Sequence, residues 1–222
     1  MRWLTLFALA SALATSVPTY AQNGGARAAG GQGPGDQAPS IQGPPGSGRS
    51  DGRRSNPSPA ADRQAAVNRM LDALKAAPSE DAAAPLEAQI TELWLRSGSP
   101  AVSLLMMRGL RELQARAPQD AAEDLGAAIT LEPDFAEAYH QRAIARFAAG
   151  DTAGAIADLQ ATLQREPRDF GAFRTLADIA QSREDWKSAY AAWQKLMEID
   201  PKTPGGEDKL KDLRRRALGE ET

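Results

Sequence analysis

Apolar residues in the second half of the chain recur with helical spacing and with a period of 34 residues. Within each period, two stretches place apolar residues three and four positions apart, as amphipathic helices do. In the middle period the stretches are residues 136–148 and 153–165. Gly150 and Asp151 separate them, because Gly150 can adopt the left-handed conformation that ends a helix and Asp151 can cap the next one. The pattern therefore predicts repeated helix-turn-helix units.

Six columns of residues recur over three successive units of this length. One column holds the acidic residue and proline that end each unit, where proline forces the second helix to stop. The other five columns hold small residues, which let helices approach closely, or large apolar residues, which fill the seam between helices. These columns are Ala121, Ala155 and Ala189; Leu125, Leu159 and Trp193; Ile129, Leu163 and Met197; Gly109, Ala143 and Ala177; and Leu105, Tyr139 and Phe173.

This 34-residue helix-turn-helix pattern resembles the tetratricopeptide repeat (TPR) family. The resemblance implies an all-α fold, a right-handed α-solenoid of stacked helix pairs, with repeats at 102–135, 136–169 and 170–203. Solenoids of this kind bury a continuous core between neighbouring units and need no disulfide or metal.

The repeats depart from the family pattern at two positions. A leucine-like position of the first helix is Arg108 and Arg142 in the first two repeats, and leucine only in the third. The turn glycine is present as Gly150 but is replaced by Arg116 and Glu184 in the other repeats. These departures concern individual helix ends and leave the prediction of the repeat unchanged.

The segments on both sides of the repeats predict further helices. Residues 61–101 indicate a degenerate helical pair, in which the second helix begins at Pro85 or is kinked near it. Residues 204–222 predict a charged capping helix with a narrow apolar stripe that includes Leu210 and Leu213. Such a helix covers the last repeat and keeps the end of the array polar.

Two segments precede the helical part. Residues 1–21 have the layout of a secretory signal peptide, with Arg2, a short apolar run and a small-residue cleavage site ending at Ala21. An N-terminal membrane anchor is the alternative, although the apolar run is shorter than a membrane span. Residues 22–60 contain 10 Gly and 6 Pro and almost no large apolar residue, which predicts a disordered linker. We therefore expect export to the bacterial periplasm, with no integral membrane segment after cleavage.

Composition excludes most catalytic chemistry. The 222 residues include one His and no Cys, which excludes disulfides, Cys-ligated zinc, thiol catalysis and multi-histidine metal sites. No Ser-His-Asp order or phosphate loop is visible, so we expect no enzymatic activity, no cofactor and no metal. The net charge is −3 for the chain and −6 for residues 61–222, which argues against a nucleic-acid partner.

The family resemblance also implies a concave groove lined by the first helix of each repeat. Transferred to this chain, the groove positions are Met106, Leu110 and Leu113, then His140, Ile144 and Phe147, then Arg174, Asp178 and Gln181. The groove would change from apolar to polar along its length, which suits an apolar anchor from a helical or extended peptide. Two alternatives remain: the three residues of the first repeat pack beneath the preceding helical pair, and His140 is an ordinary exposed residue.

These observations predict an exported adaptor that binds a protein or peptide partner in its groove. One alternative is a structural component of the cell envelope that self-associates. Another is a chaperone-like assembly factor for envelope proteins, which would use the same groove less selectively.

Overall fold

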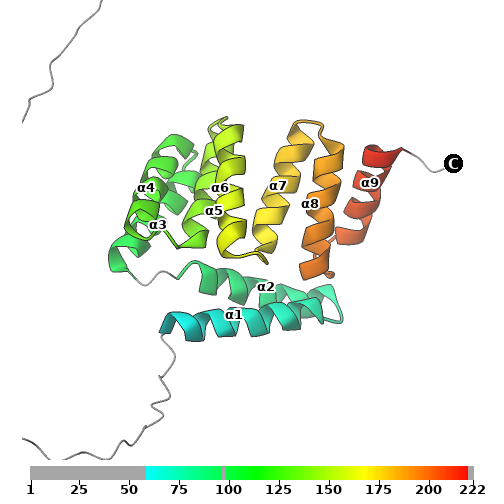
Figure 1. The fold of residues 1–222 in the computed structure, drawn as a ribbon, viewed down its shortest axis with the longest axis horizontal. Helices are drawn as coiled ribbons and strands as arrows, with labels where there is room; N and C mark the ends of the chain where they lie inside the picture. Colours follow the sequence, from blue (N-terminus) through cyan, green and yellow to red (C-terminus); the bar gives the residue numbers. More distant parts are fainter. Residues whose placement is uncertain (1–58, 97–98, 220–222) are drawn as a thin grey trace, which may run out of the picture. The chain divides into compact units, whose positions relative to one another are not determined.

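The computed structural model describes residues 59–96 and 99–219, all of which belong to one compact unit of the chain. Within these residues the chain forms nine α-helices and no strand (Figure 1). The helices are α1 (Pro59–Lys75), α2 (Glu80–Trp94), α3 (Pro100–Gln114), α4 (Pro118–Leu131), α5 (Ala136–Ala148), α6 (Thr152–Arg165), α7 (Phe170–Ser182), α8 (Trp186–Ile199) and α9 (Gly206–Leu218). The predicted signal peptide and nearly all of the predicted disordered linker lie outside the described residues.

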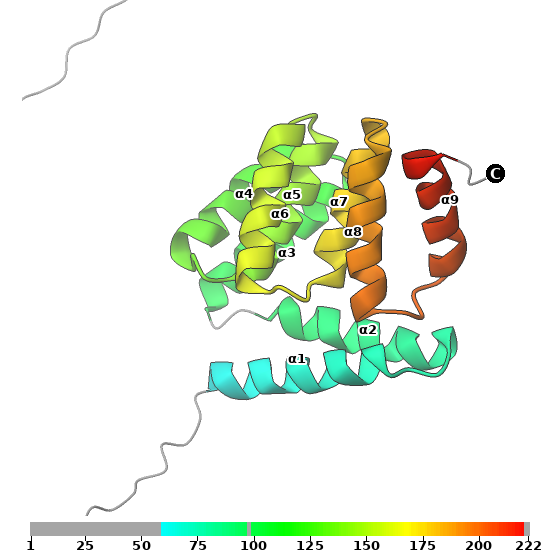
Figure 2. The ribbon, with the colours of Figure 1, turned by 45° about the vertical axis from the view of Figure 1, so that its right-hand side comes forward.

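Helices α3 to α8 form three antiparallel pairs that stack side by side, α3 with α4, α5 with α6, and α7 with α8 (Figures 1 and 2). The fold is an all-α, right-handed solenoid of helix-turn-helix units, as predicted. In the middle unit, α5 covers the predicted residues 136–148, and α6 begins one residue earlier than predicted, at Thr152. Asp151 caps α6 by accepting a hydrogen bond of 2.9 Å from the Gly154 amide, which confirms its predicted role.

The recurring columns form the core of the stack. Ala121, Ala155 and Ala189 are fully buried, because each lies where the two helices of its pair come closest. Leu125 and Leu159 are also fully buried, and each fills the seam of its own pair. Burial of one such leucine stabilises the fold by about 1.5–3 kcal/mol relative to an exposed one.

The turns inside the three pairs share one backbone conformation despite their different sequences. Arg116, Gly150 and Glu184 have φ angles of 59°, 89° and 57°, all in the left-handed region. In each turn, the amide after this residue donates to a carbonyl near the end of the first helix: Ala117 to Glu112, Asp151 to Arg146, and Asp185 to Ala180, at 2.8–2.9 Å. This is the Schellman arrangement, so replacement of the glycine costs backbone strain but does not change the turn.

Helix α9 covers the last pair. Leu213 is fully buried against α8, and the Trp193 indole donates a hydrogen bond of 3.0 Å to the Gly206 carbonyl at the start of α9. The guanidinium of Arg216 lies 4.7 Å from the centre of the Trp186 ring. The predicted capping helix is therefore present, and its apolar stripe closes the core at this end.

Helices α1 and α2 do not continue the stack. A preceding pair in a solenoid packs on the next helix, but α1 and α2 run across the ends of the later repeat helices (Figures 1 and 2). Val67 and Ile90 from this pair share one hydrophobic cluster with Phe170 and Trp193 of the third repeat. Helix α2 begins at Glu80, so the proposed start at Pro85 is wrong and the proline lies inside the helix.

Candidate functional site

The predicted groove residues fall into two layers along α3, α5 and α7. The lower layer, in the N-terminal halves of these helices, holds Met106, His140 and Arg174. The upper layer, in the C-terminal halves, holds the other six residues: Leu110, Leu113, Ile144, Phe147, Asp178 and Gln181. The two layers have different surroundings, because the α1–α2 pair lies against the lower side of the array (Figure 1).

Met106 is a core residue. It is 2% exposed and belongs to a hydrophobic cluster formed by α3, α4 and α5, with Leu95 at its edge. Neighbours in that cluster include Val102 and Leu125, so Met106 packs inside the first repeat and against the second. The prediction that it lines the groove is wrong, because its side chain is buried. The alternative, that it packs beneath the preceding helical pair, agrees with the contact of Leu95 from that pair with the same cluster.

His140 is buried between the second and third repeats. Its side chain is 10% exposed, and its Nδ1 lies 3.4 Å from Asp169 Oδ2 and 3.8 Å from Glu137 Oε2. Gly171 makes room for the ring, since a Cβ at this position would lie 2.7 Å from His140 Cε1. His140 is therefore neither a groove residue nor an ordinary exposed residue.

Two opposing effects determine the pKa of His140. Burial disfavours the charged imidazolium and lowers the pKa, whereas the negative charges of Asp169 and Glu137 raise it. The carboxylates dominate, and the pKa of His140 lies at about 10, above its ordinary value of 6.5. When protonated, the side chain is a cation held between two carboxylates, and it links α5 to the residue that caps α7.

Arg174 is bound by the chain itself. Its Nη2 donates a hydrogen bond of 2.8 Å to Thr203 Oγ1 and lies 3.9 Å from Glu87 Oε2 on α2. As a predicted groove residue, Arg174 would have its guanidinium free to bind a carboxylate of a partner. The structure instead places the carboxylate of Glu87 beside it, so the lower end of the groove in repeat 3 is occupied by α2.

Glu87 lies next to Asp200, the fully buried residue that follows α8. Burial, and secondly the negative charge of Asp200, raise the pKa of Glu87 from 4.5 to about 7. The positive charge of Arg174 opposes this shift. The contact between α2 and the array is therefore stronger when Glu87 is protonated.

The upper layer remains accessible. Leu110 and Ile144 are partly exposed and lie outside the three hydrophobic clusters, whereas Leu113 and Phe147 pack against two of them. Asp178 is exposed. The upper layer also keeps the predicted change from apolar residues in the first two repeats to polar residues in the third.

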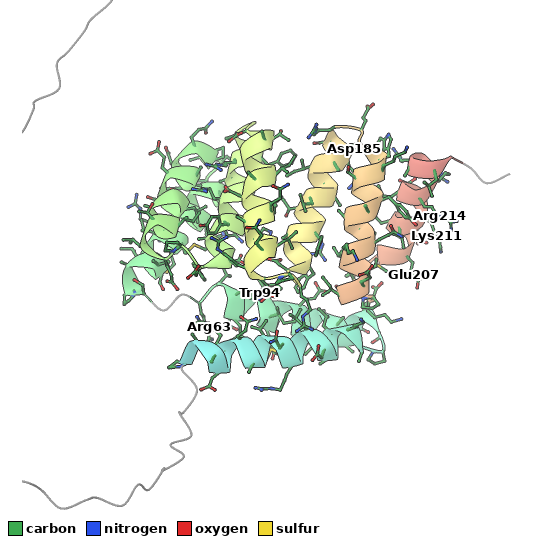
Figure 3. The ribbon with its side chains drawn as sticks, in the orientation of Figure 1. Arg63, Trp94, Asp185, Glu207, Lys211 and Arg214 are labelled. Atoms are coloured by element: carbon green, nitrogen blue, oxygen red, sulfur yellow. The ribbon has the colours of Figure 1, made fainter. Side chains whose placement is uncertain are left out.

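Aromatic and polar contacts hold the α1–α2 pair on the array. The rings of Trp94 and Phe170 lie 5.2 Å apart, and Trp94 marks the end of α2 beneath the repeats (Figure 3). Gln64 donates a hydrogen bond of 2.9 Å to Glu166, and Arg168 forms a 2.6 Å ion pair with Asp72. The pair is thus fixed to the turn between repeats 2 and 3.

Comparison with known proteins identifies the repeats. No protein-family profile matches the chain. The chain is 27% identical over 156 residues to a TPR repeat-containing protein of Rhizobium etli, covering 70% of this chain and 76% of that protein. It is 46% identical over 56 residues to tetratricopeptide repeat protein 36 of Mus musculus, covering 25% of this chain and 30% of that protein. The chain is a tetratricopeptide repeat protein.

The structural comparison agrees with this assignment. The crystal structure of MamA protein superposes with a TM-score of 0.50 at 19% identity, covering 71% of this chain and 84% of that chain. This likeness concerns the fold. Membership of the TPR family supports a role in protein–protein interaction in general, since such repeats are typically non-enzymatic interaction modules.

Two features of this TPR protein were not predicted from the sequence. One is the pairing of His140 with Glu137 and Asp169; the spacing of Glu137 and His140 on one helix face was a usable signal, because residues three apart are neighbours. The other is the position of α1 and α2. Their apolar faces indicated burial, but no pattern in the sequence indicated the third repeat as the surface that buries them.

Proposed function

We propose that this TPR protein is an exported adaptor that binds a protein or peptide segment along the upper layer of its concave face. The observation that carries the proposal is the partial exposure of Leu110 and Ile144 on neighbouring first helices, outside the hydrophobic clusters. Apolar side chains on a concave helical surface suit an apolar anchor from a helical or extended partner segment. The polar residues of repeat 3 then face the part of the segment beyond the anchor.

The partner contacts are proposed for the upper layer because the lower layer is already engaged. Met106 is in the core, His140 is held between carboxylates, and Arg174 is bound to Thr203 and close to Glu87. A partner segment therefore lies along the C-terminal halves of α3, α5 and α7, away from the α1–α2 pair.

The test is a crosslinking pull-down of the mature protein from the envelope of its source cells. The double variant Leu110→Glu/Ile144→Glu is expected to lose at least about tenfold of the captured partner, because burial of a carboxylate in an apolar contact is costly. Leu131→Glu is the matched control, since Leu131 is 59% exposed at the end of α4. Capture of the same partner by the folded double variant would contradict the groove assignment.

Export is the second part of the proposal. It rests on the signal-peptide layout of residues 1–21. Separately, no helix in the described part of the chain meets the length and hydrophobicity that a membrane span requires. Mass spectrometry of the protein purified from the periplasmic fraction is expected to give an N-terminus at Gln22. Cleavage after Ala14, where a second small-residue motif ends, would give Thr15 instead. An intact Met1 in a cytoplasmic fraction would contradict export.

Self-association is a second candidate function with an observation of its own. Leu104 and Met107 are 56% and 55% exposed on α3, at the end of the array that the α1–α2 pair leaves uncovered. A second copy that packs on this face would bury both side chains. Light scattering after size-exclusion chromatography measures the oligomeric state. The double variant Leu104→Glu/Met107→Glu should convert a dimer to monomer. A wild-type protein that is monomeric at high concentration would contradict self-association through this face.

A further inference from the structure

Three side-chain atoms of the kinds that bind metal ions lie close together at the junction of repeats 2 and 3. They are one nitrogen of His140 and one oxygen each of Glu137 and Asp169, and all lie within 4.8 Å of one another. All three residues are buried, with 8%, 3% and 1% of their surface exposed. His140 Nδ1 is buried and makes no hydrogen bond with the described residues.

Each of these three side chains is held by a second contact through its other polar atom. Gln141 donates a hydrogen bond of 2.6 Å to Glu137 Oε1, and the Ala172 amide donates one of 2.8 Å to Asp169 Oδ1. His140 Nε2 lies 3.3 Å from Thr175 Oγ1. The remaining atoms, Oε2, Oδ2 and Nδ1, are the ones that point toward each other. Outer contacts of this kind orient the ligands of metal sites.

Thr175 also determines which nitrogen of His140 carries hydrogen. Its single hydroxyl hydrogen is donated to the Gly171 carbonyl at 3.0 Å, so Thr175 Oγ1 accepts from His140 Nε2. In neutral imidazole the lone pair is then on Nδ1, which faces two carboxylate oxygens. Three acceptors that face one another require a cation between them, either a proton on Nδ1 or a metal ion.

We propose that Glu137, His140 and Asp169 bind a Zn²⁺ ion that joins repeats 2 and 3, with water as the fourth ligand. Zn²⁺ accepts imidazole and carboxylate ligands at about 2.0–2.2 Å in a tetrahedral arrangement, which places the ligand atoms about 3.3–3.6 Å apart. The separations of 3.4 and 3.8 Å from Nδ1 approach this geometry. Ca²⁺ and Mg²⁺ need about six or more oxygen ligands, which this cluster does not offer.

The proposal revises the expectation of no metal that composition suggested. A single histidine excludes multi-histidine sites, but it does not exclude a site with one imidazole and two carboxylates. The ligands come from α5 and from the capping residue of α7, so the metal would fix the angle between two successive repeats.

The test uses the full chain without a histidine tag, stripped of metal and titrated with ZnCl₂ by calorimetry. Wild-type protein is expected to bind one Zn²⁺ per chain and to gain thermal stability on saturation. Asp169→Asn keeps the cap of α7 but removes an anionic ligand, and should weaken binding at least about tenfold. Asp185→Asn is the matched control: Asp185 caps α8 in the same way, at the opposite edge of the array (Figure 3).

Because His140 is the only histidine of the chain, its imidazole nitrogens give one pair of NMR signals without further assignment. Zn²⁺ at one equivalent should shift the Nδ1 signal, while Nε2 keeps its hydrogen. The proposal is overturned if the folded wild-type chain binds no Zn²⁺ at micromolar concentration, if Asp169→Asn binds as tightly as Asp185→Asn, or if Nδ1 is unaffected.

Discussion

The guanidinium of Arg142 holds the buried carboxylate of Asp158 through two hydrogen bonds, of 2.8 and 2.7 Å. The same two columns of the first repeat hold Arg108 and Asp124, which form an ion pair at 2.9 Å. In the third repeat these columns are Leu176 and Ala192, both apolar. The arginine that departs from the family's leucine is thus always accompanied by an aspartate sixteen positions later.

This pairing predicts a specific pattern of stability. Arg142→Leu alone should reduce the free energy of unfolding by about 2–3 kcal/mol, because it leaves the buried Asp158 with Arg146 as its remaining cation. The double variant Arg142→Leu/Asp158→Ala reproduces the apolar pair of repeat 3 and should return to within about 1 kcal/mol of wild type. Urea denaturation measures both. If the double variant is as unstable as Arg142→Leu, the loss of stability does not come from leaving the Asp158 carboxylate without Arg142.

The left-handed turn residues predict a gain in stability. Glu184→Gly should raise the free energy of unfolding by about 0.5–1 kcal/mol, because glycine adopts a φ near 57° without the steric cost of a side chain. Arg116→Gly should do the same. Gly150→Ala, at φ 89°, is the control of opposite sign and should lose about 1 kcal/mol in thermal denaturation. Equal stabilities for all three variants would contradict the conformational argument.

The close approach of Gly171 to the buried ring of His140 predicts that a larger residue at position 171 is destabilising. Gly171→Ala places a Cβ 2.7 Å from His140 Cε1 and 3.2 Å from Asp169 Oδ1, which should cost about 1–3 kcal/mol of unfolding free energy. Gly126→Ala is the control, because its nearest neighbour is Arg142 Nη1 at 3.5 Å and alanine favours the helix. Urea unfolding of the two variants should therefore give shifts of opposite sign.

The raised pKa of Glu87 predicts that stability depends on pH. The folded state binds the proton more tightly than the unfolded state, whose pKa is near 4.5, so stability falls as the pH rises from 4.5 through about 7. The slope from this one group is at most about 1.4 kcal/mol per pH unit. Glu87→Gln should flatten this part of the profile and raise stability at pH 8. An unchanged slope in unfolding experiments between pH 5 and 8 would exclude Glu87 as its source.

The repeat was predictable because its determinants are local. Each column combines a size requirement with a fixed spacing, and a buried alanine such as Ala155 is needed wherever two helices cross closely. The turns were predictable for a similar reason, because Asp151 and the residue before it act within one or two positions of the helix ends. Even the replacement of glycine by Glu184 leaves the turn intact, since its strain is small compared with the packing it permits.

The site was less predictable because its contacts join residues that are distant in sequence. The family pattern places residues on a face but does not say which of them the next repeat will cover, and His140 is covered because position 171 is glycine. Arg174 lies on the expected face as well, but Glu87 from α2 reaches it. An amphipathic stripe such as that of α2 shows that a face is buried. It does not identify the surface that buries it.

The position of the α1–α2 pair has a consequence for how the protein folds and unfolds. Solenoids usually contact only their nearest neighbours in sequence, so their ends can fray independently. Here Gln64 bonds to Glu166, and Arg168 pairs with Asp72, across about a hundred residues of chain. These contacts join the first helix of the described chain to the turn between repeats 2 and 3. Loss of the third repeat would release α1 and α2 together, and the array should unfold as one cooperative unit, with slower folding than an open array of the same length.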